Sequence, residues 1–273
     1  MTSRRDRVLT YAVLLVFTVL ALVPVLQVLS AALSSPGAAG PGLRLPDGLH
    51  LENFADAWTR GQFGQYLRSS VLVSVAVVVT AAVLSTLAAY AFGTMRFPGA
   101  TVLFYLFVLG LTIPEEAVVI PLYYDFRGVG LLDTYWALVL PQVAQSVAFG
   151  TFWMRTYFAG SSQALIEAAR CDGATSWGVL WRVLVPSGRP AITTMLVITF
   201  MWTWNEFLLA LVMVTSDSRR TVPLGLAFFQ GQHSSDTALL AAGAVLVATP
   251  VVLVYLFFQR RFVEGMLSGA IKE

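Results

Sequence analysis

Six apolar stretches recur along the chain, and each is long enough to cross a lipid bilayer as a helix. A bilayer core of about 30 Å requires roughly 20 apolar residues in helical form. None of the stretches alternates between apolar and polar residues with the period of two that a membrane barrel would need. The pattern predicts an all-α membrane protein with six transmembrane helices, over residues 8–33, 69–92, 101–121, 136–157, 191–213 and 238–258.

The composition supports insertion into lipid. Of the 273 residues, 57% are hydrophobic and only 12% are charged, whereas soluble domains carry about 25% charged residues. The net charge of +2 gives no reason to expect a nucleic-acid partner. A lone cysteine, Cys171, excludes an internal disulfide and a cysteine-based metal cluster. The two histidines, His50 and His233, lie far apart, so neither a metal site nor a cofactor is expected.

The distribution of basic residues predicts the orientation in the membrane. The first apolar stretch follows three arginines but is much longer than the apolar region of a cleaved signal peptide, so we expect a retained helix. With the N-terminus inside, eleven of the 17 Lys and Arg residues fall in the inner segments. Because inner loops of membrane proteins are enriched in these residues, both termini are expected in the cytoplasm. No second domain or internal repeat is evident, so residues 1–273 are interpreted as one transmembrane domain.

The inner loop over residues 158–190 carries a helical pattern of its own. Ser161 or Ser162 is suited to cap a helix over Gln163 to Cys171, and Gly173 can turn the chain after it. A second helical run, Thr175 to Val185, is expected to end at Pro186, which lacks a backbone N–H. The loop is therefore expected to present two short helices joined by an elbow.

This loop resembles the EAA loop of permease subunits of bacterial ABC importers. The matching residues are Glu167, Ala168, Ala169, Gly173 and Pro186, although Val183 and Val185 stand where the family pattern has Ile and Leu. Further segments resemble the sugar-importing branch, in matching order around the loop: LENFADAW (51–58), LAAYAFGTMRFPG (87–99), GLLDTYWALVLPQ (130–142), TWNEFLLAL (203–211) and FVEGMLSGAIKE (262–273).

The resemblance implies a coupling role for the loop and a set of partners. Its first short helix would dock on an ATP-binding subunit, with Glu167, Ala168, Ala169, Asp172, Gly173 and Pro186 forming the coupling segment. The family also implies a pair of ATP-binding subunits, a second and different permease, an extracytoplasmic solute-binding protein and a location in the bacterial inner membrane. Taken alone, Glu-Ala-Ala also occurs by chance in solvent-exposed helices.

The chain has no ATPase motif of its own. A phosphate-binding P-loop needs a Lys followed by Ser or Thr, whereas Lys272, the only lysine, is followed by Glu273. The chain is therefore interpreted as a permease and not as an enzyme. ATP hydrolysis in a separate subunit would rock the permease between inward-facing and outward-facing states.

Ionisable residues inside apolar spans are costly and are candidates for function. Glu206 and its neighbour Asn205 fall in the fifth predicted span, and Glu115 and Glu116 follow Pro114 in the third. We expect Asn205 and Glu206 to contact a sugar, and Trp202 and Trp204 could stack on its apolar faces. The alternatives are that Asn205 and Glu206 hold helices together, or that the second permease alone binds the solute.

Three other functions fit parts of the sequence. An ion-coupled secondary transporter would explain the intramembrane carboxylates, but the expected repeats are not evident. A membrane-embedded protease would use paired glutamates such as Glu115 and Glu116, but its accompanying motif is missing. The same type of importer could also carry a solute other than a sugar.

Overall fold

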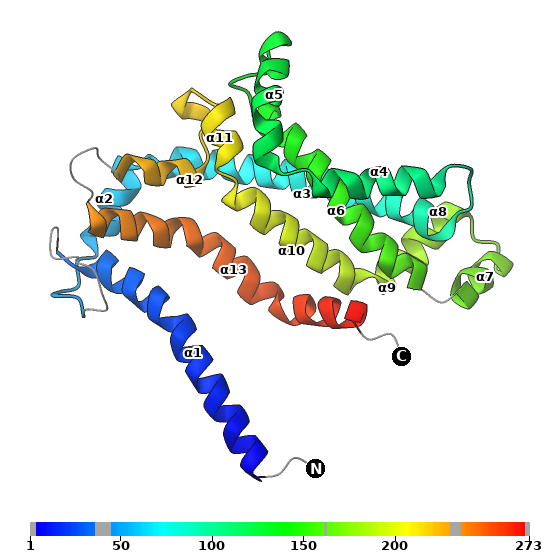
Figure 1. The fold of residues 1–273 in the computed structure, drawn as a ribbon, viewed down its shortest axis with the longest axis horizontal. Helices are drawn as coiled ribbons and strands as arrows, with labels where there is room; N and C mark the ends of the chain where they lie inside the picture. The colour runs from blue at the N-terminus through cyan, green and yellow to red at the C-terminus, as the bar shows by residue number, and fades with distance from the viewer. Residues whose placement is uncertain (1–3, 36–44, 161–162, 230–235, 271–273) are drawn as a thin grey trace. The chain divides into compact units, whose positions relative to one another are not determined.

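The computed structural model describes residues 4–35, 45–160, 163–229 and 236–270, and every regular element in those ranges is helical (Figure 1). Four helices are long and apolar enough to cross a membrane, or up to six if each of two bent helix pairs forms one span. The all-α fold class predicted from the sequence is confirmed. The predicted helix caps at Ser161 and Ser162, most of the Gly- and Pro-rich segment 34–46, and His233 lie outside the described residues.

The chain divides into two compact units, residues 1–64 with 224–250 and residues 65–223 with 251–273. In the first unit, α1 (Arg4–Leu33) is followed by the short helix α2 (Glu52–Arg60). Asn53 joins them, since its buried amide donates to the carbonyl oxygens of Ala32 and Ser34, both at 2.9 Å. The most apolar part of α1 has no buried residue, as expected of a helix whose surroundings are lipid or another membrane helix.

The second unit is built around three long helices, α3 (Phe63–Thr94), α6 (Tyr135–Gly160) and α10 (Arg189–Asn205). They approach closely at Gly150 of α6. A Cβ added there would lie 2.7 Å from the Cβ of Ser85 on α3 and 2.8 Å from the sulfur of Met195 on α10. Small residues at such a crossing allow helix backbones to pack tightly in a membrane.

The third predicted span is not one continuous helix. It forms α4 (Ala100–Thr112) and α5 (Glu115–Gly128), which meet at an angle of 98° (Figure 1). The break lies at Ile113 and Pro114, both of which have extended backbone conformations. Because the residue before a proline is disfavoured in the helical region, Pro114 ends α4, and Glu115 begins α5.

The fifth predicted span is also broken. Its first part is α10, which follows the loop over residues 158–190 at a bend of 78°. Its second part is the short helix α11 (Leu208–Met213), separated from α10 by Glu206 and Phe207. The last predicted span lies within α13 (Thr237–Ala270).

A network of hydrogen bonds at Asp133 fastens two loops of the second unit. The Asp133 carboxylate accepts from the N–H groups of Thr215 and Ser216 at 3.1 and 2.9 Å, from the Ser216 hydroxyl and from Arg219 at 3.0 Å. Burial acts to raise the pKa of this carboxyl, but the bonds from Ser216 and Thr215 and the Arg219 charge outweigh it, so its pKa lies below its ordinary value. The network therefore stabilises the charged form of Asp133.

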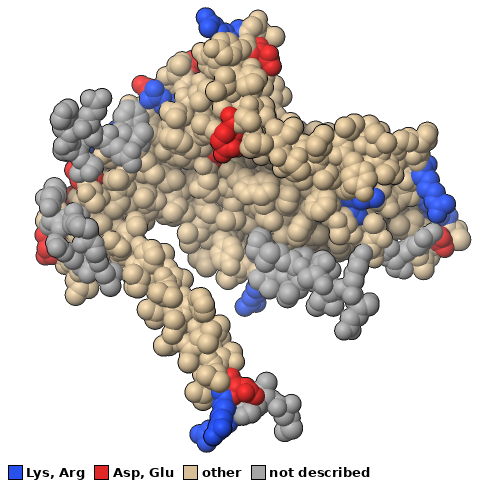
Figure 2. Space-filling model, viewed as in Figure 1, with Lys and Arg blue, Asp and Glu red and all other residues tan. Residues whose placement is uncertain are grey.

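The surface agrees with a lipid environment. Most of the visible face carries neither acidic nor basic side chains (Figure 2). Large apolar side chains such as Phe17, Val75 and Leu106 are more than half exposed. Soluble proteins rarely expose so much apolar surface.

Candidate functional site

The break between α10 and α11 is held by the side chain of Glu206. The backbone of Glu206 is extended, so α10 ends at Asn205. One carboxylate oxygen of Glu206 accepts a hydrogen bond of 2.6 Å from the N–H of Leu209, in the first turn of α11. A side-chain oxygen that accepts from a free N–H is what a new helix start requires. Glu206 is therefore both a helix cap and a polar group inside an apolar span.

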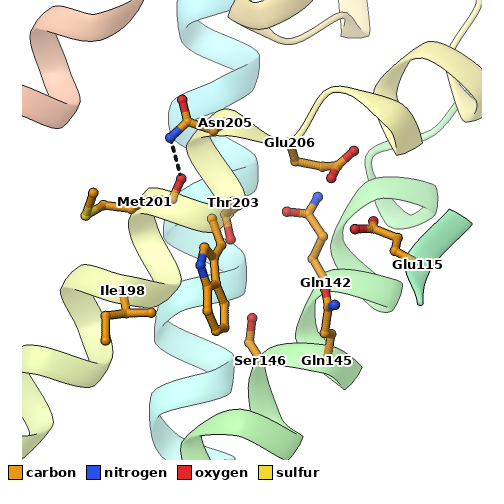
Figure 3. Close-up of a pocket in the computed structure, with 10 residues that line it drawn as sticks. Glu115, Gln142, Gln145, Ser146, Ile198, Met201, Thr203, Asn205 and Glu206 are labelled. Carbon is orange, nitrogen blue, oxygen red and sulfur yellow. Dashed lines mark hydrogen bonds between the residues drawn. The ribbon is translucent and has the colours of Figure 1, made fainter. Parts of the chain in front are cut away.

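A pocket of about 560 Å³ opens beside this break (Figure 3). Its volume is within the range of small-molecule sites. The lining side chains come from the start of α5, from α6, from the end of α10 and from the break itself. They are Glu115, Gln142, Gln145, Ser146, Ile198, Met201, Trp202, Thr203, Asn205 and Glu206.

Three polar residues of α6 form one wall of the pocket. Gln142, Gln145 and Ser146 are spaced by three and four positions and therefore share one helix face. Gln142 donates to the carbonyl oxygen of Leu138 at 2.8 Å, which leaves its own carbonyl oxygen available. Ser146 is 5% exposed and points into the pocket, and its hydroxyl has no hydrogen-bond partner among the described residues (Figure 3).

Two carboxyl groups face this wall. Glu115, the first residue of α5, and Glu206 are close enough for their carboxyl groups to interact. In Figure 3 both side chains extend toward Gln142. None of the ten lining residues is basic. Within the part of the chain that is described, no group of His, Cys, Asp and Glu could hold a metal ion.

Only some of the residues predicted from the sequence to contact solute line this pocket. Trp202 lines it, is half exposed and lies edge-on against Phe149 with ring centroids 4.7 Å apart. Asn205 also lines it and donates to the carbonyl oxygen of Met201 at 2.7 Å. Trp204 does not line it: its ring is buried and packs on Phe200. Glu116, next to Glu115, is also not among the lining residues.

Sequence reasoning missed the α6 wall, although a signal was present. Gln142, Gln145 and Ser146 are polar residues at helical spacing inside an apolar span. Polar side chains in a transmembrane helix face the protein interior or a water-filled cavity more often than lipid. The same argument that singled out Glu206 would have identified these three.

The loop over residues 158–190 contains the predicted elbow. Its first arm is α7 (Gln163–Cys171), which ends in a Schellman motif. The N–H of Gly173 donates to Arg170 and the N–H of Ala174 donates to Ala169, at 3.0 and 2.9 Å. Gly173 has a φ of +81°, a conformation that residues with a side chain rarely adopt. The turn predicted at Gly173 is confirmed.

The second arm runs past the residue predicted to end it. Thr175 caps α8 (Ser176–Gly178), which continues through a π-helical turn over Val179–Leu184 into α9 (Val185–Ser187). Pro186 lies inside this continuous run, directly after the π-helical turn, and the helix continues to Ser187. The expectation that Pro186 ends the helix is therefore wrong. The chain turns at Gly188, where an added Cβ would lie 2.9 Å from the carbonyl oxygen of Leu184.

Apolar packing holds the elbow to the long helices. Ile166 and Ala169 of α7 and Leu180 of the π-helical turn pack in a core with Met154 and Phe158 of α6. The hydroxyl of Tyr90 on α3 donates to the carbonyl oxygen of Ser176 at 2.9 Å. On the other side of α7 and its turn, Glu167, Ala168, Arg170, Cys171 and Asp172 are exposed.

Comparison with protein families decides the class of this protein. Residues 81–267 match the family described as the binding-protein-dependent transport system inner membrane component. The chain belongs to this family. It is thus a membrane-embedded, multi-pass permease component of an ABC importer, and not the ATPase of such a system.

Curated relatives span nearly the whole chain. The chain is 31% identical to the diacetylchitobiose uptake system permease protein NgcG of Streptomyces coelicolor, over 99% of this chain and 91% of that protein. It is 32% identical to the trehalose transport system permease protein SugB of Mycobacterium tuberculosis, over 92% and 93%. It is 35% identical to the probable ABC transporter permease protein YurM of Bacillus subtilis, over 90% and 82%.

A solved structure shares the fold of this permease. It is a chain of a bacterial ABC transporter involved in the import of the acidic polysaccharide alginate. The two chains superpose with a TM-score of 0.81 at 26% identity, over 96% of this chain and 99% of that one.

Proposed function

We propose that this permease imports a sugar or an oligosaccharide, which passes through the pocket beside Glu206. The observation that carries the proposal is a pocket with carboxyl, amide and hydroxyl groups from three helices, within a bundle that is otherwise apolar. Relatives named for diacetylchitobiose, trehalose and arabinooligosaccharides support a sugar as the solute.

The lining groups suit the chemistry of a sugar. Sugar hydroxyls both donate and accept, and the pocket offers carboxylate acceptors at Glu115 and Glu206 and amides at Gln145 and Asn205. Trp202 adds a half-exposed aromatic ring, on which an apolar sugar face can stack. A sugar hydroxyl can therefore replace water as the hydrogen-bond partner of these groups.

The exposed side of α7 is the proposed contact with an ATP-binding subunit. Glu167, Ala168 and Asp172 lie on this side, while Ile166 and Ala169 fix the helix to the core. Gly173 sets the angle of the elbow, and Pro186 lies in the arm that leads back to α10. Movement of an ATP-binding subunit would therefore be transmitted from α7 through α8, the π-helical turn and α9 to α10, whose end lines the pocket.

The proposed assembly contains two ATP-binding subunits, a second permease and a solute-binding protein outside the membrane. Both termini and the elbow would be cytoplasmic, in accordance with the bias of Arg and Lys toward the inner segments. A membrane-impermeant thiol reagent tests this orientation through Cys171, the only cysteine, which is exposed. Labelling in inside-out vesicles and not in intact cells is expected, and the reverse would contradict it.

Uptake of labelled sugars by cells that express the complete importer tests the pocket. The variant Asn205→Ala removes an amide from the pocket, and we expect its uptake rate to fall about fivefold, the equivalent of one hydrogen bond. Glu116→Gln is the matched control, because Glu116 does not line the pocket. Equal uptake by the two variants would contradict the proposed pathway. Uptake that persists when the ATP-binding subunit is inactivated would favour an ion-coupled carrier.

Cross-linking tests the coupling surface. Single cysteines along the docking surface of the ATP-binding subunit are paired with Cys171, at the end of α7. A cross-link whose yield changes with nucleotide is expected. Absence of any cross-link in an assembled, ATP-hydrolysing complex would contradict docking through α7.

A further inference from the structure

We infer that the pocket selects uncharged saccharides and rejects anionic ones, such as oligosaccharides of uronic acids. The inference concerns the charge of the solute and rests on the proposed sugar-import function. It follows from the set of charged groups that line the pocket and from the hydroxyl of a buried serine that points into it.

The charged groups around the pocket are all acidic. Glu115 and Glu206 both extend toward Gln142 of the α6 wall (Figure 3), and none of the ten lining residues is Arg, Lys or His. A proton shared between the two carboxyl groups would still leave one negative charge. Low-dielectric walls around such a charge strengthen its field, and the helices that surround the pocket are apolar. A uronate carboxylate would therefore be repelled, whereas a hydroxyl would find an acceptor.

A second observation shows that the pocket is built for a polar ligand. Ser146 is 95% buried, because its exposed fraction is 5%. Its hydroxyl points into the pocket without a hydrogen-bond partner among the described residues (Figure 3). A hydroxyl that faces a pocket is hydrogen-bonded there by water or by a polar ligand. A sugar hydroxyl can donate to it and accept from it.

The alginate importer has the same fold, so the charge of the solute is the property in which we expect the two transporters to differ. That transporter imports an acidic polysaccharide, and its chain superposes on this one over 96% of this chain's length. The inference therefore implies that similar helices enclose pathways for solutes of different charge. In this chain Glu115 and Glu206 give the pocket the sign that opposes an acidic solute.

Charged thiol reagents measure the field in the pocket directly. Cys171→Ser removes the only native thiol, and Gln145→Cys introduces one at an exposed position of the pocket wall. In the complete importer, labelling rates are compared for the cationic trimethylammonioethyl methanethiosulfonate and the anionic sulfonatoethyl methanethiosulfonate. We expect the cationic reagent to react about tenfold faster than the anionic one, relative to their rates with a free thiol.

Two further variants test whether Glu115 and Glu206 cause the difference between the cationic and anionic labelling rates. Adding Glu115→Gln with Glu206→Gln preserves size and removes both charges, and the ratio is expected to fall toward one. Adding Glu116→Gln removes a neighbouring charge outside the pocket and should leave most of the ratio intact. An equal ratio in all three proteins would overturn the inference. So would a thiol that even the small neutral methyl methanethiosulfonate cannot reach, because the pocket would then be closed to solutes.

Protection by saccharides separates this inference from the proposed function. Neutral disaccharides of glucose, galactose and mannose are tested alongside digalacturonate for their ability to slow labelling by the neutral reagent. Protection by a neutral disaccharide alone, with digalacturonate gaining protection in the Glu115→Gln, Glu206→Gln variant, is the expected result. Equal protection by digalacturonate in the unmodified pocket would overturn the selection while leaving sugar import intact. A tenfold labelling ratio without protection by any saccharide would instead contradict the sugar function.

Discussion

The pocket and the elbow lie in the same compact unit but are held in shape by different parts of the chain. At the pocket, side chains fix the backbone: Glu206 caps α11 and Asn205 bonds to its own helix. At the turn that ends α7, backbone hydrogen bonds from the N–H groups of Gly173 and Ala174 fix the conformation. The exposed residue Ala168 takes part in the elbow only through its main chain, as the acceptor for Asp172.

This difference decides how each region responds to substitution. A change at Glu206 alters the chemistry of the pocket and the start of a helix together. A change at Ala168 alters an exposed surface and leaves the Schellman turn in place. Function and stability are therefore coupled at Glu206 and separable on the exposed side of the elbow, at residues such as Ala168.

The largest expected effect is at Gly150, one helical turn beyond Ser146 of the pocket wall. Gly150→Leu forces a side chain between Ser85 and Met195, where even a Cβ is too close. Such overpacking should lower the free energy of unfolding by about 3 kcal/mol or more. Thermal stability of the detergent-solubilised protein measures this. Gly110→Ala is the control, because the nearest atom to its added Cβ is 3.9 Å away, and it should be neutral or slightly stabilising.

A smaller loss is expected at Asp133, which belongs to neither region. Asp133→Ala removes the acceptor for two loop N–H groups and the partner of Arg219, and should cost about 2 kcal/mol of unfolding free energy. Because the pKa of this carboxyl is lowered in the folded protein, its contribution is present at neutral pH and is lost as the pH falls below about 4. The stability difference from wild type should therefore shrink in acid.

Asp125→Ala provides the comparison for Asp133. Asp125 is exposed, and its substitution should change the unfolding free energy by less than about 0.5 kcal/mol. If the two aspartate variants lost equal stability, the loop network would not have the role assigned to it.

Backbone conformation alone is tested at Gly173. Gly173→Ala places a side chain at a φ of +81° with no atom within 4 Å, so strain is the only expected penalty, about 1 to 2 kcal/mol. We expect the angle of α7 to change and ATP hydrolysis to become partly uncoupled from transport. Gly128→Ala adds the same methyl group where there is equal space and no unusual φ. Tight coupling in both variants would show that the elbow angle does not matter.

The smallest effect on stability distinguishes the two roles of Glu206. Glu206→Ala removes the acceptor for the Leu209 N–H and should cost about 1 kcal/mol. Glu206→Gln keeps an oxygen at that place and should retain most of the stability while removing the charge. Thermal stability and uptake are measured for both variants. Equal stability of the two would mean that the cap contributes nothing.

The sequence predicted where helices form better than where they break. Apolar length predicted six spans, with the third as one stretch over residues 101–121, and the structure has four candidate spans, or up to six if each bent pair forms one span. The 98° break in the third is larger than a kink, because Ile113 and Pro114 both leave the helical conformation. The break at Glu206 has neither Gly nor Pro to signal it. It depends on a side-chain cap, and Glu is not among the residues preferred for helix caps.

The candidate site could be predicted only in part. Glu206, Asn205 and Trp202 were predicted because each is conspicuous within an apolar span, and the structure places all three at one pocket. Trp204, two residues from Trp202, points to the opposite side and is buried. The partner wall on α6 comes from residues about 60 positions away, and no local pattern specifies which helix faces α10.

The carboxyl group of Glu206 has a consequence for how a bound solute would be felt by the protein. One oxygen holds the Leu209 N–H, and the same group lines the pocket. A solute that binds this carboxylate in place of the Leu209 N–H destabilises the first turn of α11. By reciprocity, stabilising that turn lowers the affinity for the solute by the same free energy. Hydrogen exchange of the Leu209 amide should therefore report whether the pocket is occupied, without any measurement of transport.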